Sequence, residues 1–182
     1  MAGLLLSDGY ISYSARSKNG YLSLTLSHLY YVYFVYNILS HYCTRYPVFR
    51  ERHRYGKSIF GLEIHTRSML CITELYSLFY INKTKIIKFY VYNELTYIAL
   101  AHWIIGDGTD SYSIKYVVML INILIIKYDI LCTIRYYSFP VIYFYKRYMP
   151  KLRSIVEPFM HISMMYKQGK KKKENWLSGL KW

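Results

Sequence analysis

Three segments of the chain alternate between polar and apolar residues around a turn signal, which is the pattern of β-hairpins. Alternation with period two places every second side chain on one face, so each segment can bury one face of a strand pair. The three are residues 10–26 around Lys18-Asn19-Gly20, residues 45–54 with 57–67 around Tyr55-Gly56, and residues 131–146 around Phe139-Pro140.

Other segments carry apolar residues every three to four positions, the spacing of helices. This spacing predicts a helix over 113–127, with Ser113 as its N-terminal cap. Residues 28–41 are rich in Tyr and Val, which favour strands, but we predict a helix because this segment is the repeat partner of 113–127. Shorter helices are expected at 73–80, at 94–105 after an Asn93 cap, and at 150–157.

Short motifs recur in the same order in the two halves of the chain. Asp8-Gly9 ends an apolar run, and Asp107-Gly108 ends a similar run 99 positions later. Asn37-Ile38-Leu39 then recurs at 122–124, only 85 positions later. The fall in offset means that the second half lacks about 14 residues directly after Asp107, where the first half has its first hairpin. The chain is therefore predicted to be an α+β protein of two similar halves, the second without its first hairpin.

We divide the chain into a first half at 1–90, a second half at 91–168 and a basic tail at 169–182. The tail opens on a run of lysines at 170–173 and is expected to be disordered. No Pro-, Gly- or Ser-rich linker separates the two halves, and 82–92 is the one candidate connection.

Composition narrows the range of partners. The 182 residues carry a formal net charge of +14, and 54% of them are hydrophobic, which excludes general disorder. The charge favours a nucleic acid or an anionic membrane surface. The apolar runs fall short of the ~20 residues that a membrane helix needs, so no membrane span is expected. No P-loop or GxGxxG motif indicates a small-molecule cofactor, and Cys43, Cys71 and Cys132 form no disulfide or zinc pattern.

Basic residues concentrate on the first two hairpins. Arg50, Arg52 and Arg54 alternate, so they share one face of a strand. A solvated sheet face is the alternative interpretation, but only Glu51 and Glu63 oppose the cluster. We predict contacts to phosphate and guanine in a DNA major groove, which a two-stranded ribbon can enter. The predicted DNA-binding residues are Arg16, Lys18, Arg45, Arg50, Arg52, Arg54, Lys57 and Arg67.

Asp8 and Asp107 each stand at the C-terminal end of an apolar helix. One Asp-Gly pair alone would indicate no more than a turn. A carboxylate at this end faces the negative pole of the helix dipole, so it needs a cation nearby. Small residues such as Gly3, Ala99 and Gly106 let the two helices pack side by side, which would bring both carboxylates to one divalent metal. A site with few protein ligands, all of them oxygen atoms, suits Mg²⁺.

These residues resemble the two motifs of a double-motif LAGLIDADG homing endonuclease, the type encoded by group I introns of organelles and especially of fungal mitochondria. The motifs lie at 1–9 and 100–108. The likeness also runs through 74–76, 82–87 and 164–167, so it covers nearly the whole chain.

The resemblance implies two αββαββα halves whose sheets form a saddle over DNA, in a monomer with internal pseudo-two-fold symmetry. It implies that Asp8 and Asp107 bind the metal and activate water for cleavage. It also implies that Lys85 and Lys167 act near the scissile phosphates. Two prolines typical of the family are replaced, by Lys88 and by Ile162.

Three functions are compatible with this pattern. The first is a site-specific double-strand DNA endonuclease of intron homing that hydrolyses phosphodiesters with Mg²⁺. The second is a maturase, a splicing cofactor that binds group I intron RNA and does not need the carboxylates. The third is an inactive remnant, because the missing hairpin removes half of the second saddle. Both aspartates and both lysines are retained, which favours the endonuclease, and the A+T-rich codons of Tyr and Ile favour a mitochondrial gene and location.

Overall fold

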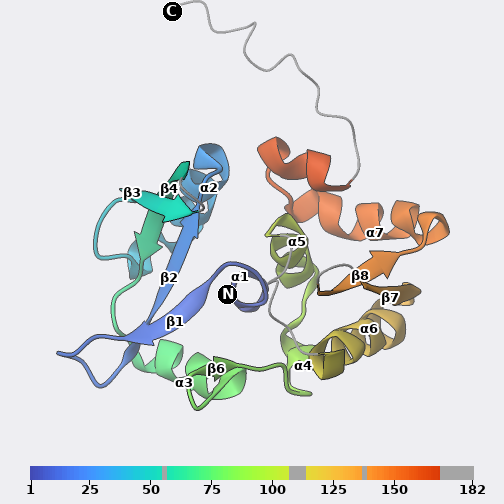
Figure 1. Ribbon diagram of the computed structural model, residues 1–182, viewed down its shortest axis with the longest axis horizontal. Coiled ribbons are helices and arrows are strands. Elements are labelled where there is room, and N and C mark those ends of the chain that lie inside the picture. Colours follow the sequence, from blue (N-terminus) through green and yellow to red (C-terminus); the bar gives the residue numbers. More distant parts are fainter. Residues whose placement is uncertain (55–56, 107–113, 137–138, 169–182) are drawn as a thin grey trace, which may run out of the picture.

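The computed structural model describes residues 1–54, 57–106, 114–136 and 139–168, without the side chains at 52, 54, 57 and 59. The first half follows the predicted order of elements (Figure 1). Its αββαββα plan and both of its predicted hairpins are confirmed. The elements are helix α1 (Ala2–Leu5), strands β1 (Tyr10–Tyr13) and β2 (Gly20–Leu26), helix α2 (Leu29–Leu39), strands β3 (Val48–Arg54) and β4 (Lys57–His65), and helix α3 (Leu70–Phe79).

The four strands form one antiparallel sheet in the order β1-β2-β4-β3. Leu22 and Leu24 of β2 and Leu62 and Ile64 of β4 are buried on the face that contacts α2 and α3. The residues between them are largely polar and belong to the opposite face, because side chains alternate along a strand. The sheet therefore has one apolar face under helices and one polar face.

Segment 28–41 is helical, as its repeat partner indicated, although its content favours a strand. The helix covers Leu29–Leu39 and continues as a 3-10 turn at Ser40–Tyr42. Val32, Val35 and Leu39 are buried three to four residues apart, so they form the stripe that packs on the sheet. Burial of this stripe outweighs the strand propensity of the aromatic residues.

The connection between the halves contains a tight hairpin of β5 (Tyr80–Ile81) and β6 (Thr84–Lys85). Its two turn residues, Asn82 and Lys83, have positive φ angles of 47° and 64°, which a two-residue hairpin turn of this type requires.

The predicted Asn93 cap is wrong. Asn93 lies inside a separate one-turn helix, α4 (Val91–Glu94), and the next helix, α5, spans Tyr97–Ile105. The cap of α5 is Thr96, whose extended backbone lets its side chain accept a hydrogen bond from the Ala99 amide at 3.2 Å.

The second half is shorter. Residues 106–113 separate α5 from the next helix, whereas residues 6–28 separate α1 from α2, so the predicted loss of the first hairpin is confirmed by chain length alone. Within the described residues, this half has one two-stranded sheet. The predicted cap Ser113 and the tail 169–182 lie outside the residues that the structure describes. The remaining described elements are α6 (Ile114–Tyr128), β7 (Cys132–Tyr136), β8 (Pro140–Phe144), α7 (Met149–Val156) and three 3-10 segments, Lys146–Tyr148, Glu157–Phe159 and Ile162–Gln168.

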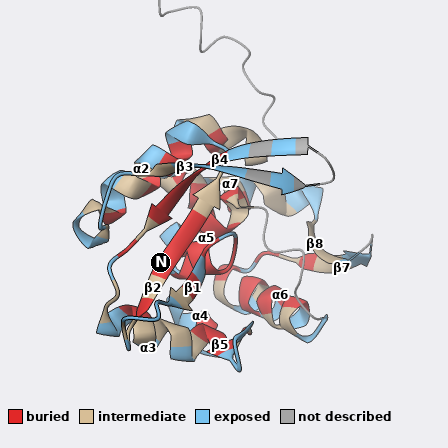
Figure 2. Ribbon diagram, turned by 60° about the vertical axis from the view of Figure 1, so that its left-hand side comes forward, coloured by how far each residue is buried: buried red, intermediate tan, exposed pale blue. Residues whose placement is uncertain are grey.

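One hydrophobic core runs through both halves. Buried residues follow β2, α5 and α6 (Figure 2), and they include Leu5 of α1, Leu100 of α5 and Leu124 of α6. Helices α1 and α5 lie next to each other at the centre of the molecule (Figure 1). The ends of these two helices therefore define the place where the halves meet.

No helix among the described residues has the length and apolar character to span a membrane. Cys43, Cys71 and Cys132 are all free thiols.

Candidate active site

The contact between α1 and α5 depends on two glycines. A Cβ atom on Gly3 would lie 2.0 Å from the carbonyl oxygen of Ala99, and one on Gly106 would lie 2.3 Å from Cβ of Ser7. Neither distance is possible between real atoms, so a larger residue at either position would push the helices apart. The close approach that the small residues predicted is confirmed.

Asp8 lies in the turn that ends α1 and is exposed to solvent. The turn is closed by the Gly9 amide, which donates to the Leu4 carbonyl at 2.7 Å. A Cβ on Gly106 would lie 2.9 Å from Oδ2 of Asp8, so the carboxylate rests against the glycine that directly precedes Asp107. Asp107 itself lies outside the described residues. The structure thus brings Asp8 to the C-terminal end of α5, at the residue that precedes Asp107 in the sequence.

Lys85 of β6 holds the turn that carries Asp8. Its ammonium group donates to the carbonyl oxygens of Ser7 at 3.3 Å and Gly9 at 2.8 Å, one residue on each side of Asp8. Burial lowers the pKa of Lys85 to about 8, against the opposing effect of the negative Asp8. At neutral pH the lysine is still mostly charged, so a cation lies beside the carboxylate. The structure thus places Lys85 beside the first motif, whereas its role near a scissile phosphate stays a prediction.

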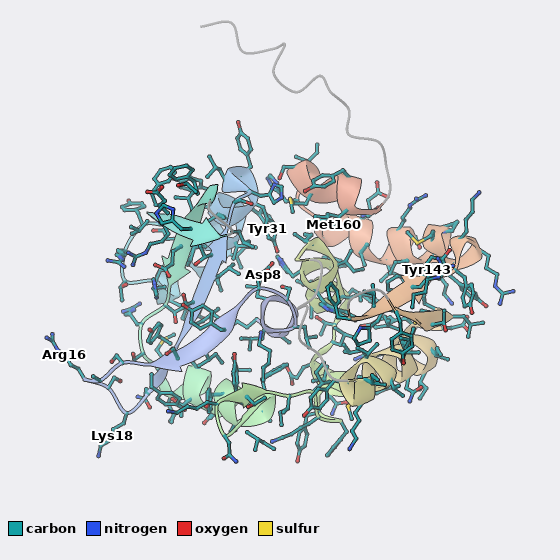
Figure 3. All side chains as sticks on the ribbon, in the orientation of Figure 1. Asp8, Arg16, Lys18, Tyr31, Tyr143 and Met160 are labelled. Atoms are coloured by element: carbon teal, nitrogen blue, oxygen red, sulfur yellow. The ribbon has the colours of Figure 1, made fainter. Side chains whose placement is uncertain are left out.

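A buried pair that sequence reasoning did not assign to the site joins the halves above Asp8. The hydroxyl of Tyr31, from α2, is 2.6 Å from Nδ1 of His102, from α5. Burial lowers the pKa of His102 to about 4, so the ring is neutral at neutral pH, and its tautomer decides which of the two groups donates. Burial also raises the pKa of Tyr31, with a further contribution from the negative charge of Asp8 (Figure 3). His102 is buried and packs between the two halves.

Lys167 is placed differently from Lys85. It lies in the 3-10 segment Ile162–Gln168 rather than in a turn, with its ammonium group 5.7 Å from the ring centre of Tyr166. The Tyr166 hydroxyl in turn is 3.0 Å from Nε2 of His28, which precedes α2. A role for Lys167 beside Asp107 stays a prediction, because Asp107 lies outside the described residues.

The basic residues predicted to bind DNA fall into three groups. Arg16 and Lys18 are exposed in the loop between β1 and β2 and extend away from the body of the molecule (Figure 3). Arg45 is also exposed, ahead of β3. Arg52, Arg54 and Lys57 have described backbones only, so the direction of their side chains stays a prediction.

Arg50 and Arg67 have partners within the protein. Nε of Arg50 lies 2.5 Å from Oε2 of the buried Glu63, and Nε2 of His65 lies 2.9 Å from the same oxygen. Burial alone would raise the pKa of Glu63, but the hydrogen bonds from Arg50 and His65 outweigh it and lower the pKa. Arg67 donates to the carbonyl of His41. Arg50 therefore neutralises a carboxylate on the polar face of the sheet, in addition to any contact with DNA.

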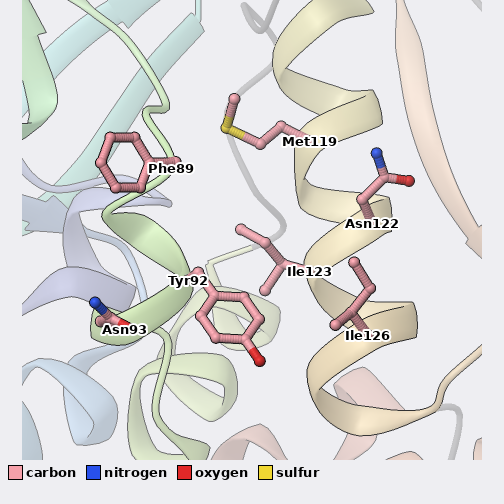
Figure 4. Close-up of a pocket in the computed structure, with 7 residues that line it drawn as sticks. All are labelled: Phe89, Tyr92, Asn93, Met119, Asn122, Ile123 and Ile126. Atoms are coloured by element: carbon pink, nitrogen blue, oxygen red, sulfur yellow. The ribbon is translucent and has the colours of Figure 1, made fainter.

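A separate groove lies between α4 and α6 (Figure 4). It is lined by Phe89, Tyr92 and Asn93 on one side and by Met119, Asn122, Ile123 and Ile126 on the other. None of these residues is acidic or basic, so the groove is not part of the catalytic arrangement around Asp8.

The fold and this helix-pair site define a class of protein. The model of the LAGLIDADG DNA endonuclease family matches residues 1–152, and the chain belongs to this family. The predicted family, the α+β fold and the function class of DNA endonuclease are thereby confirmed.

Individual relatives agree with this assignment. The chain is 31% identical over 147 residues to the intron-encoded endonuclease ai4 of Dictyostelium discoideum. This alignment covers 70% of the chain and 92% of the relative. It is 31% identical over 193 aligned residues to the cytochrome b mRNA maturase bI2 of Saccharomyces cerevisiae. That alignment covers 92% of this chain but 46% of the relative.

A solved structure shares the fold. The chain is similar to the structure of the homing endonuclease I-WcaI bound to its DNA recognition sequence, with a TM-score of 0.85 and 24% sequence identity. The match covers 92% of this chain and 83% of the I-WcaI chain.

Proposed function

We propose that the protein is a site-specific endonuclease of intron homing that cuts both strands of DNA by metal-dependent hydrolysis. The observation that carries the proposal is the contact of the Asp8 carboxylate with Gly106, the residue before Asp107. In this proposal Asp8 and Asp107 each provide one carboxylate, one from each half, which suits a reaction that must be performed once on each DNA strand. The charge of +14 supports a polyanionic substrate.

The residues present fit Mg²⁺. Among the described residues, no group of three or more His, Cys, Asp or Glu could hold a metal, so a dedicated cage of protein ligands is not indicated there. Mg²⁺ uses one or two carboxylates and completes its shell with water and substrate phosphate, which Asp8 and Asp107 could provide for. When bound, the ion would polarise the phosphoryl oxygens and lower the pKa of a bound water.

The protein's own groups have separate tasks in this proposal. Lys85 fixes the turn around Asp8 through the Ser7 and Gly9 carbonyls and keeps a positive charge close to the scissile phosphate. Gly3 and Gly106 bring the two motif helices into contact. The exposed Arg16 and Lys18 extend the basic surface along the duplex. The protein is proposed to act as a monomer, in the mitochondrion, without a small-molecule cofactor.

A second candidate is a maturase of a group I intron. The similarity to the yeast cytochrome b mRNA maturase, which extends over 92% of this chain, favours it. A maturase would use the basic surface for RNA and would not need Asp8 or Asp107.

A plasmid assay distinguishes the two. The target carries the exon junction of the host gene without its intron, and the reaction contains Mg²⁺. We expect linear product from the native protein and none from Asp8→Asn or Asp107→Asn. Asp129→Asn is the matched control: Asp129 pairs with Lys151 on the surface and has a φ of 50°, which Asn adopts readily. No cleavage by the native protein overturns the endonuclease proposal, and rescue of splicing by Asp107→Asn supports the maturase.

A further inference from the structure

The two halves are unequal in a second way, beyond the missing hairpin. In the first half, an isolated bridge pairs Cys43 with Thr66 at the base of the β3–β4 hairpin. In the second half, Cys132 pairs with Phe144 at the base of β7–β8. Each of these cysteines is followed by threonine, so the two pairs are equivalent positions in the repeat. The chain between them covers 44–65 in the first half but only 133–143 in the second.

The shortened hairpin has one face in the core and one face free of it. Ile134, Ile142 and Phe144 pack against the core on the side of α6. The register assigns the opposite face to Thr133, Arg135, Val141 and Tyr143. This face is the counterpart of the polar face of the first-half sheet, which is built from four strands. The second half thus has a much smaller surface on which base edges could be read.

The second half nevertheless has exposed basic side chains on and next to this hairpin. The guanidinium of Arg135 lies 3.3 Å from the ring centre of Tyr143, and Arg135 remains exposed. Lys146 and Arg147 are exposed directly after β8, with Arg147 held 4.9 Å from the ring centre of Tyr148. A guanidinium stacked on an aromatic ring is held in place at little entropic cost and can still bind phosphate through its edge.

Phosphate contacts position a protein on DNA, whereas base-edge contacts carry the sequence information. The second half has the basic groups for phosphate contacts but few groups for base-edge contacts. We propose that the two halves read DNA unequally: the first-half sheet discriminates bases, and the second half holds the duplex through phosphate contacts from Arg135, Lys146 and Arg147. This inference rests on the proposed function, because it requires a DNA target.

Binding without divalent metal tests the inference with four duplexes: the intact exon junction, the same duplex with one or the other half-site scrambled, and a fully scrambled duplex. A crosslinker attached through Lys18→Cys, in a Cys71→Ser background that removes the exposed thiol, identifies the half-site contacted by the first half. We expect scrambling of that half-site to weaken binding about 100-fold or more, and scrambling of the other by less than about 10-fold. Equal losses overturn the inference and leave the proposed function intact. No preference for the intact duplex over a fully scrambled one overturns the proposed function itself.

Variants of the second half provide an independent measurement. Arg135→Gln is expected to weaken binding to all four duplexes by the same factor and to reduce the salt dependence of binding by about one phosphate contact. Arg147→Gln should behave in the same way. Lys151→Gln is the matched control, since Lys151 is already paired with Asp129 on the outer surface. An altered base preference in the second half-site for Arg135→Gln and Arg147→Gln would show that these residues read sequence, and would overturn the inference.

Discussion

The two halves of this protein share a centre and differ at the periphery. Around α1 the chain builds four strands with two covering helices, whereas around α5 the described chain builds two short strands. The helix contact itself is so tight that no side chain fits at Gly3 or Gly106. The comparison shows that a strand pair can be lost from a half without disturbing the helix pair, because the strands lie outside the helix contact.

The largest effect is expected at the shared centre. Asp8→Asn keeps the shape of the side chain and removes its negative charge, so DNA cleavage should fall about 1,000-fold or more. The rate of linear-product formation measures this, with Asp129→Asn as control. If Asp8→Asn cuts as fast as the native protein, the site at the helix pair is wrong.

The next effect concerns the contact that both halves depend on. Gly3→Ala places a methyl group against the backbone carbonyl of Ala99, which cannot move aside, so the free energy of unfolding should fall by about 3 kcal/mol. Gly20→Ala is the control, because its nearest neighbour is the side-chain methyl of Ile11 at 3.0 Å. Urea unfolding compares the two. Equal losses would mean that the α1–α5 contact is no tighter than the rest of the fold.

Lys85 tests whether the halves contribute equally to catalysis. Lys85→Met removes the hydrogen bonds to the Ser7 and Gly9 carbonyls and the charge beside Asp8, and cleavage should fall about 100-fold. Lys88→Met is the control, because among the described residues the Lys88 ammonium group donates a hydrogen bond only to the Ser77 carbonyl. An equal loss for Lys167→Met would show that both halves keep an active lysine, whereas a loss confined to Lys85→Met would show that the second half does not.

The junction between the halves should be sensitive to acid. The pKa of His102 in the folded state, about 4, is below its ordinary value of 6.5, so between these values the unfolded chain binds a proton that the folded chain does not. Stability is therefore expected to fall by about 3 kcal/mol as the pH falls through this window. His102→Gln should flatten this part of the profile, measured by urea unfolding at pH 7 and pH 4. An unchanged profile would show that another group controls it.

The smallest effect expected is a difference in local stability. The second half lacks a hairpin, so its helices have less sheet to pack on, and amides of α6 and α7 should exchange at a free energy about 1 kcal/mol lower than those of α2 and α3. Native-state hydrogen exchange measures both sets in one sample. Identical protection, or a single sharp melting transition, would mean that the shorter half is as stable as the longer one.

Sequence reasoning was reliable where a pattern is local. Alternation predicted the strands of the hairpins, and the repeat settled the helical state of Leu29–Leu39 against its own propensity. It failed at Asn93, because Asn93 and Thr96 are both good caps, and in the structure Asn93 belongs to α4 while Thr96 caps α5. The hairpin predicted at 131–146 is confirmed as β7–β8, but its register came only from the structure, since the register of a strand pair is not visible in one strand.

The sequence by itself determined the two-half plan, the missing hairpin, the two Asp-Gly motifs and the basic character of the surface. These are properties of spacing and composition, which are set by neighbours along the chain. The tertiary structure decided which distant groups meet: Lys85 with the turn around Asp8, Tyr31 with His102, and Arg50 with Glu63. Such pairs come from different elements, and only the close packing of α1 on α5 and of the strands in register brings their polar atoms within hydrogen-bonding distance.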